Sequence, residues 1–159
     1  MCGIVGYVGP GSTLDVLLGG LKRLEYRGYD SAGISVIDPD LGLQTRKRAG
    51  KLQVLVDDLK DSPLSDAHIG IGHTRWATHG APTDGNAHPH LGGDHLKLSL
   101  IHNGIIENFS ELKAELLAQG VKFSSETDSE VAAHLVARAY DETKDLKSAF
   151  VAVVNRLHG

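Results

Sequence analysis

The sequence lacks the features that mark several whole classes of protein. One cysteine among 159 residues cannot form an internal disulfide. No apolar stretch approaches the ~20 residues that a membrane-spanning helix needs. The first residues show neither the basic leader nor the apolar core of a signal peptide. We therefore expect a cytoplasmic protein that makes no use of a membrane.

Positive charge is also scarce. Sixteen Lys and Arg stand against 20 Asp and Glu, which gives a formal net charge of −4. The longest basic run is Arg46-Lys47-Arg48, which we interpret as a solvated strand face. This balance argues against nucleic-acid binding, because such binding requires a basic surface. With five prolines and 41% hydrophobic residues, the composition indicates one globular domain with a real core.

Hydrophobic spacing predicts an α+β fold. Because strands and helices do not alternate strictly, we expect stacked antiparallel sheets with helices on the outside. The predicted strands cover residues 3–8, 31–37, 43–49, 68–73 and 96–102. The predicted helices cover residues 12–27, 52–59, 110–119, 128–140 and 145–157.

Three segments carry finer expectations. The strand over 3–8 should be buried, and the alternation over 31–37 indicates a half-buried strand. Residues 74–95 are rich in Gly, Pro, His, Thr and Asn, which predicts a long loop of the kind that is usually functional. The predicted helix caps are Ser12 with Asp15, Ser110, and Thr127 with Glu130 in a capping box.

Cys2 is informative because of its position. Methionine removal is favoured before a small side chain, so the mature chain would begin with Cys2 and a free α-amine. An α-amine titrates near ~7.7–8.0 and a thiol near ~8.5, so the amine can accept the thiol proton directly or through one water. One residue then supplies both nucleophile and base. The alternative is a free cysteine that serves as a small buried hydrophobic residue.

Residues 73–80 concentrate binding side chains at the end of a predicted strand. Arg75 can grip a carboxylate through two parallel hydrogen bonds. Trp76 would form a packing wall, with Thr78 and His79 as hydrogen-bonding partners. The alternative is a surface arginine beside a core tryptophan.

Histidines gather in the same part of the chain, which suggests a zinc-binding module as a competing hypothesis. Only His88-Pro89-His90 has close spacing, and no cysteine pair or His-Glu-x-x-His motif accompanies it. We therefore predict no metal site. The clustered histidines are His73, His79, His88, His90, His95 and His102.

Two further positions suggest a polar active site. Asn103 and Gly104 offer a side-chain amide and an unhindered backbone N–H side by side, which are the donors of an oxyanion hole. The alternative for this pair is a two-residue hairpin turn. Asp128 begins a predicted helix, where its charge either complements the helix dipole or pairs with a substrate ammonium.

Six sequence blocks together resemble one known family. The chain is similar to the N-terminal glutaminase domain of glutamine–fructose-6-phosphate aminotransferases, which are class II amidotransferases of the N-terminal-nucleophile hydrolase superfamily. An initial Cys-Gly-Ile is shared with other class II amidotransferases, whereas blocks 24–33 and 73–80 point to the glucosamine-forming branch. The matching blocks are residues 1–6, 24–33, 73–80, 86–90, 102–108 and 125–130.

The resemblance implies a role for each residue named above. Cys2, with its own α-amine as base, would attack the side-chain amide of L-glutamine, and water would hydrolyse the resulting thioester to glutamate after ammonia leaves. Asn103 and Gly104 would stabilise the oxyanion. The other implied assignments are Arg75 for the α-carboxylate, Asp128 for the α-ammonium, Gly104 as a further substrate contact, Trp76, Thr78 and His79 for the pocket loop, and Arg27 for ordering the N-terminus.

The resemblance also implies a larger protein. The family fold is a four-layer α/β/β/α sandwich of antiparallel sheets, which we expect to be incomplete at the C-terminal end of residues 1–159. The sugar-isomerising domain, where ammonia would convert fructose 6-phosphate to glucosamine 6-phosphate, is absent from these residues. We expect no cofactor, and a homo-oligomer is compatible with the resemblance. Two alternatives stay open: a glutamine-binding fragment without turnover, and the glutaminase domain of another class II amidotransferase.

Overall fold

The computed structural model describes residues 2–77, 80–94 and 97–159. The chain divides into two compact units, Met1–Pro89 and His90–Gly159. Each unit combines an antiparallel sheet with helices, so the predicted α+β class is confirmed. None of the helices within the described residues has the length and apolar character needed to cross a membrane.

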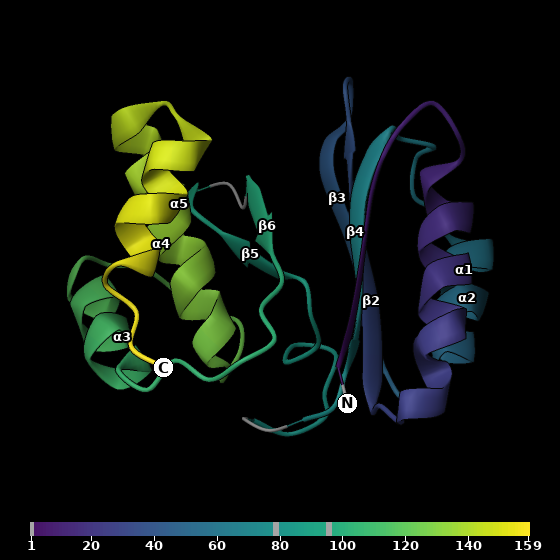
Figure 1. Ribbon diagram of the computed structural model, residues 1–159, viewed down its shortest axis with the longest axis horizontal. Coiled ribbons are helices and arrows are strands. Elements are labelled where there is room, and N and C mark those ends of the chain that lie inside the picture. The colour runs from purple at the N-terminus through teal and green to yellow at the C-terminus, as the bar shows by residue number, and fades with distance from the viewer. Residues whose placement is uncertain (1, 78–79, 95–96) are drawn as a thin grey trace. The chain divides into compact units, whose positions relative to one another are not determined.

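The first unit is a four-stranded antiparallel sheet with its helices packed on one face (Figure 1). Its elements are β1 (Gly3–Val8), α1 (Thr13–Leu24), the 3₁₀ turn η1 (Glu25–Arg27), β2 (Ser31–Asp38), β3 (Gly42–Ala49), α2 (Leu52–Asp61) and β4 (Ile69–Arg75). The strand order is β1-β4-β2-β3, and all neighbours are antiparallel. All four predicted strands are present, with ends shifted by at most two residues.

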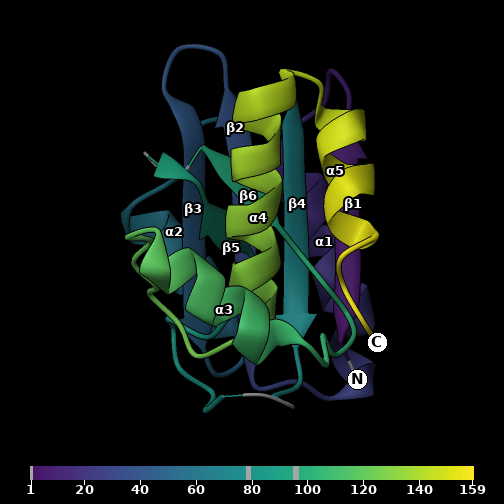
Figure 2. The same ribbon diagram turned by 90° about the vertical axis from the view of Figure 1, so that its left-hand side faces the viewer.

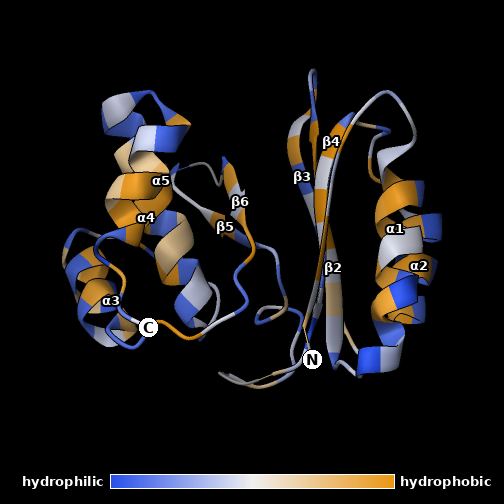
Figure 3. Ribbon diagram, in the orientation of Figure 1, coloured by the Kyte–Doolittle hydropathy of each residue, from blue (hydrophilic) through white to orange (hydrophobic). Residues whose placement is uncertain are grey.

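Helix α1 forms the main contact with this sheet. Its leucine face is as predicted, and Leu17 and Leu21 are fully buried in one cluster with Ile34 of β2. Figure 3 shows the hydrophobic residues of α1 and of the adjacent strands in orange. The predicted cap also forms, because the Ser12 hydroxyl accepts a hydrogen bond from the Asp15 N–H at 3.5 Å.

The burial of β2 differs from the prediction. Residues Ser31 to Val36 are all buried, whereas the alternating sequence predicted a half-buried strand. The reason is that β2 is an inner strand and a loop covers its second face. A Cβ atom built on Gly33 would lie 2.2 Å from the carbonyl oxygen of His88, so the loop backbone lies directly on the strand.

The prediction of a buried β1 is wrong in the opposite sense. Ile4 is 49% exposed and Val8 is 78% exposed. β1 is an edge strand, and only the face that carries Val5 and Tyr7 packs against the core under α1. An apolar sequence therefore does not guarantee burial on both faces.

The basic triplet is not a solvated face. Arg46 and Arg48 both bind the carboxylate of Asp58 on α2, at 3.0 and 2.8 Å. Lys47 points to the other face of β3 and donates to the carbonyl of Gly85 at 2.9 Å. The strand period of two sends the outer arginines toward α2, so they pair with its acidic residue.

The second unit packs three helices against a two-stranded sheet. Its elements are β5 (His90–Gly92), β6 (Leu98–Leu100), α3 (Phe109–Ala118), α4 (Asp128–Thr143) and α5 (Leu146–Val154). α4 is its central helix, contacting α3, α5 and both strands, and Figure 2 shows it lying alongside α5. The backbone of β5 comes very close to α4, because a Cβ on Gly92 would lie 2.2 Å from the carbonyl oxygen of Ala133.

Three predictions for this part of the chain are corrected. The predicted loop over 74–95 contains β5 and the last two residues of β4, and the predicted strand over 96–102 is paired only over β6. A three-residue strand is too short to show a period-two pattern. The cap of α3 is Asn108 rather than Ser110. The Asn108 side chain instead binds the backbone of Arg156 and His158, at 2.9 and 3.0 Å.

The close contact between Gly33 of β2 and the carbonyl oxygen of His88 predicts that one added methyl group at position 33 destabilises the fold. Gly33→Ala should lower the free energy of unfolding by about 1–3 kcal/mol, because neither strand backbone nor loop carbonyl can move away without losing its own contacts. Gly6→Ala in β1 is the matched control, since a Cβ there meets nothing within 4 Å. Urea unfolding of both variants makes the comparison, and equal stabilities would contradict the packing described for β2.

Candidate functional site

In the first unit, Cys2 lies immediately before β1 and beside the residue that follows β4. The Trp76 backbone N–H donates to the Cys2 sulfur at 3.3 Å, and the Trp76 carbonyl oxygen lies 3.7 Å from the same sulfur. Cys2 is only partly buried. The alternative of a buried hydrophobic cysteine is therefore wrong, and the sulfur has both a polar donor and access to solvent.

Arg75 and Trp76 show the reverse of the burial expected for a surface arginine beside a core tryptophan. Arg75 is 4% exposed, whereas Trp76 is 53% exposed. The Arg75 guanidinium donates to the carbonyl oxygens of Gly80 and Ala81, at 3.2 and 3.4 Å. The loop after β4 therefore binds the buried Arg75 guanidinium through two carbonyl oxygens, whereas the side chain of the next residue, Trp76, is exposed.

The turn after α1 contacts this region through Gly28. Gly28 has φ of 73°, a left-handed conformation that favours glycine, and a Cβ there would lie 3.1 Å from the Trp76 ring. Arg27 precedes it at the end of η1 and is half-buried. The sequence block around Arg27 therefore contributes directly to the surroundings of Trp76.

Asp30 is a polar residue of this site to which the sequence alone assigned no role. Its carboxylate accepts hydrogen bonds from the Ala77 N–H at 2.5 Å and from the Ser31 hydroxyl at 3.1 Å. Its own N–H donates to the Arg75 carbonyl at 2.7 Å. The only sequence clue was its place in the block over 24–33.

The predicted loop residues Thr78 and His79 lie outside the described residues, as does His95. The rings of His73 and His88 are 4.5 Å apart, and His90 Nε2 lies 2.9 Å from the Thr127 hydroxyl. Among the residues that the structure describes, no three His, Cys, Asp or Glu side chains are grouped as metal ligands.

In the second unit, Asn103 and Gly104 follow β6 and lead toward α3, so they do not form a hairpin turn. Both are exposed. The His102 ring lies over Gly104, where a Cβ would come within 2.7 Å of Nε2, and its Nδ1 is 3.4 Å from the Ser129 hydroxyl. The His102 ring therefore packs against the backbone of Gly104, one of the two predicted oxyanion donors.

Asp128 is buried at the first position of α4. One carboxylate oxygen accepts a hydrogen bond from the Ile106 N–H at 2.8 Å, and the other lies 3.3 Å from the Ser129 hydroxyl. This bond ties the segment after Asn103 and Gly104 to the start of α4. The segment that carries Asn103 and Gly104 is therefore linked to Asp128 through the backbone of Ile106.

Glu130 corrects the predicted capping box. Its oxygens accept four hydrogen bonds of 2.5–2.7 Å from the N–H and hydroxyl groups of Ser124 and Ser125, and none from Thr127. The Thr127 hydroxyl instead lies 2.9 Å from His90 Nε2. Glu130 lies in the first turn of α4 and is 2% exposed, so its hydrogen bonds fix the Ser124–Ser125 loop that leads to Asp128.

The charge of Glu130 is stabilised by this network. Burial by itself raises the pKa of Glu130, but the His134 ring and the donors of Ser125 and Ser124 outweigh it and lower the pKa from 4.5 to about 2. His134 Nε2 lies 3.8 Å from the carboxylate. Glu130 is therefore ionised under all physiological conditions.

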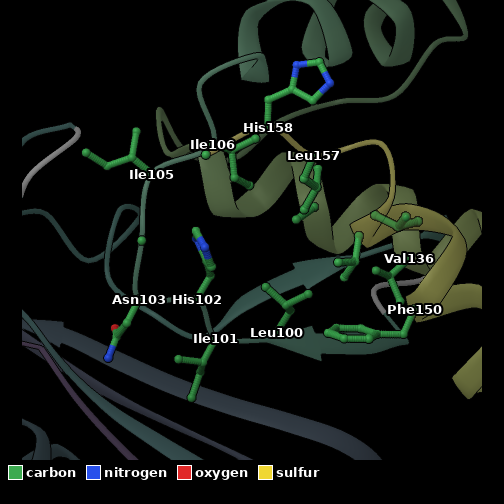
Figure 4. A pocket seen from close by; sticks show the side chains of 15 residues that line it. Leu100, Ile101, His102, Asn103, Ile105, Ile106, Val136, Phe150, Leu157 and His158 are labelled. Carbon is green, nitrogen blue, oxygen red and sulfur yellow. The ribbon is translucent and has the colours of Figure 1, made fainter.

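An open groove of about 470 Å³ lies between β6, α4 and α5 (Figure 4). Its wall is built mainly of aliphatic and aromatic side chains, including Leu100, Phe150 and Leu157. The side chain of Asn103 points away from this wall. No Asp, Glu, Lys or Arg side chain lies in the described lining, so the groove is not suited to the two charges of an amino acid.

The sequence matches the family described as "Glutamine amidotransferase domain" over residues 57–155. Glutamine–fructose-6-phosphate aminotransferase (isomerizing) from Leifsonia xyli is 65% identical over 159 residues, and that from Streptomyces coelicolor is 60% identical. Both alignments cover 100% of this chain, which spans 26% of the length of each relative.

Solved structures agree with this similarity. The glutamine phosphoribosylpyrophosphate amidotransferase from B. subtilis, complexed with ADP and GMP, is 29% identical with a TM-score of 0.82. The alignment covers 100% of this chain and 33% of that one. A structure described as the allosteric regulatory enzyme of purine biosynthesis gives the same TM-score and identity. The predicted N-terminal-nucleophile hydrolase type of α+β fold is confirmed.

The lowered pKa of Glu130 predicts a defined pH dependence of stability. Since the folded pKa lies below the ordinary value of 4.5, its contribution is complete above pH 4.5 and is lost as the pH falls toward about 2. Glu130→Gln should therefore be less stable at pH 7 by an amount on the order of 3 kcal/mol, with a flatter pH profile between pH 4.5 and 2. Urea unfolding at pH 7 and pH 3 measures this, with Glu111→Gln on the exposed side of α3 as control. Parallel profiles for wild type and Glu130→Gln would rule out the assigned cause.

Proposed function

Because the chain belongs to the glutamine amidotransferase domain family, we propose that it hydrolyses the side-chain amide of L-glutamine to give glutamate and ammonia. The observation that carries this proposal is the position of Cys2, whose sulfur contacts the backbone N–H and carbonyl of Trp76, the residue that follows the buried Arg75. A partly exposed sulfur in contact with the residue that follows a buried arginine suits a reaction on a small substrate that carries a carboxylate.

The proposed reaction proceeds in two halves. The Cys2 sulfur forms a bond to the amide carbon of glutamine while the free α-amine of the mature Cys2 takes the thiol proton. That proton passes to the leaving nitrogen, the C–N bond breaks, and ammonia departs from a thioester. Water then attacks the thioester carbon, and glutamate leaves as the sulfur regains its proton. The reaction consumes one water and needs no cofactor.

We assign recognition of the α-carboxylate and α-ammonium groups of glutamine to two residues of opposite charge. Arg75 would bind the α-carboxylate and Asp128 the α-ammonium, while Trp76, Thr78 and His79 would line and close the pocket. Support comes from the burial of Arg75 and Asp128, both below 6% exposed. A ligand that lacks either charge would leave a buried group without its partner, which is costly and therefore selective.

Asn103 and Gly104 are the proposed oxyanion donors, with Gly104 also contacting the substrate. Support comes from the exposure of this segment and from its tether to Asp128 through Ile106. Removing one donor of an oxyanion hole typically costs ~10²–10³ in rate. Arg27 is proposed to order the N-terminal residues, since it ends the turn whose Gly28 packs on Trp76.

The wider activity is proposed from the relatives. They are named glutamine–fructose-6-phosphate aminotransferase (isomerizing), and this chain spans 26% of their length. We propose that residues 1–159 are an incomplete glutaminase domain, and that the released ammonia serves to convert fructose 6-phosphate to glucosamine 6-phosphate in a separate isomerising domain. A cytoplasmic location and a homo-oligomer belong to the same proposal.

Replacement of the proposed nucleophile gives the first test. Cys2→Ala should reduce glutamate release from glutamine to the rate in buffer, because no other thiol is present in the chain. Enzymatic glutamate assay measures the rate, and intact mass reports whether each protein begins at Cys2. Equal rates in wild type and variant would refute the mechanism. Calorimetry that detects glutamine binding without glutamate release would support the alternative of a binding fragment.

Removal of one charge tests the head-group assignment. Asp128→Asn keeps an oxygen that can accept from the Ile106 N–H but lacks the negative charge. We expect KM for glutamine to rise by about 10–100-fold, as expected when a buried ion pair loses one partner. Asp145→Asn is the matched control, since Asp145 also accepts a backbone N–H at a helix start in the same unit. A rise in KM that is equal in the two variants would show that the charge of Asp128 is not specific to the substrate.

A further inference from the structure

The peptide group that faces Cys2 is held from its other side by Asp30. The carbonyl of this peptide belongs to Trp76 and its N–H to Ala77. The Trp76 oxygen lies 3.7 Å from the Cys2 sulfur, and the Ala77 N–H donates to the Asp30 carboxylate at 2.5 Å. Because a trans peptide is planar, its C=O and N–H point in opposite directions. Fixing the N–H on Asp30 therefore fixes the direction of the C=O toward the sulfur.

A second set of contacts makes Asp30 a rigid support. Its N–H donates to the Arg75 carbonyl and its own carbonyl accepts from the Gly50 N–H, both at 2.7 Å. The second carboxylate oxygen is occupied by the Ser31 hydroxyl at 3.1 Å. The backbone of Asp30 thus joins the end of β4 to the end of β3, while its side chain binds the Ala77 N–H and the hydroxyl of the neighbouring Ser31.

We propose that Asp30 is a positioning residue that holds the Trp76–Ala77 peptide, and with it the Trp76 N–H, in place on the Cys2 sulfur. This inference rests on the proposed role of Cys2 as nucleophile. The carboxylate does not touch the sulfur, and its effect is transmitted through the backbone of Trp76. Displacement of a reacting group by about 1 Å can cost about 10²-fold in rate, so a support of this kind affects turnover strongly.

Two substitutions separate the hydrogen bond from the charge. Asp30→Ala removes the acceptor for the Ala77 N–H, whereas Asp30→Asn keeps one acceptor oxygen of similar position. Both leave the backbone bonds to Arg75 and Gly50 in place. The matched control is Asp38→Ala at the opposite end of β2, where the carboxylate likewise binds the backbone and accepts from the N–H groups of Asp40 and Leu41, each at 2.8 Å.

Two readouts are compared in the full chain. Cys2 is the single cysteine, so the rate of iodoacetamide alkylation, followed by intact mass, reports on this sulfur alone. Glutamate release gives kcat and KM for glutamine. For Asp30→Ala we expect alkylation slowed by about 3–10-fold and kcat lowered by about 10–100-fold, with KM changed less than about threefold. Asp30→Asn should recover most of both losses, and Asp38→Ala should match wild type.

Three other outcomes would overturn the inference. Wild-type alkylation and kcat in Asp30→Ala would show that the peptide is held without the carboxylate. Equal losses in Asp38→Ala would show a general effect of destabilising β2, which thermal unfolding of all three variants detects independently. A rise in KM without a fall in kcat would place Asp30 in substrate binding. If wild type releases no glutamate, the proposed function fails, yet the alkylation rates still decide the role of Asp30.

Discussion

The antiparallel register between β1 and β4 is the constraint on which the candidate site of the first unit depends. Gly3 pairs with Thr74, which sets the residue before β1 beside the residues after β4. The contact between Cys2 and Trp76 joins positions 74 residues apart. Closing such a loop costs entropy, which is offset by the ladder of β1 and β4 and by the helices packed on it. A slip of one residue would turn every side chain of β1 to the other face.

That register is stabilised by glycines as much as by apolar side chains. A Cβ on Gly70 would meet Thr13 of α1 at 2.6 Å, and one on Gly72 would meet Leu21 at 3.1 Å. The alternating Ile and Gly of β4 therefore lets α1 lie directly on the backbone. Gly3 has the same role, because its Cβ would lie 2.6 Å from Leu24 at the end of α1. The residue after Cys2 is small because the helix end packs against it.

Strong local patterns made most of the fold predictable, and long-range contacts explain what was missed. The leucine face of α1 and its Ser12 cap are encoded within single segments, so the sequence is sufficient for them. The burial of β2 depends on a loop some fifty residues later, and the short strand β5 exists only through its pairing with β6. Residue types in the site could be recognised from motifs. The opposite burial of Arg75 and Trp76 could not, because it depends on which loop returns over β4.

Two of the acidic residues, Asp58 and Asp128, differ in whether their partners neutralise the carboxylate. Asp58 is neutralised by two guanidinium groups, and its carboxylate serves to join α2 to β3. Asp128 is as firmly held, but its partners among the described residues are a backbone N–H and a hydroxyl, which orient the carboxylate without cancelling its charge. A buried carboxylate that is held in one orientation but not neutralised is stabilised more by binding a cation of equal charge than a carboxylate that already has such a partner. This difference, rather than burial alone, is the physical reason to assign Asp128 and not Asp58 to the ammonium group of the proposed substrate.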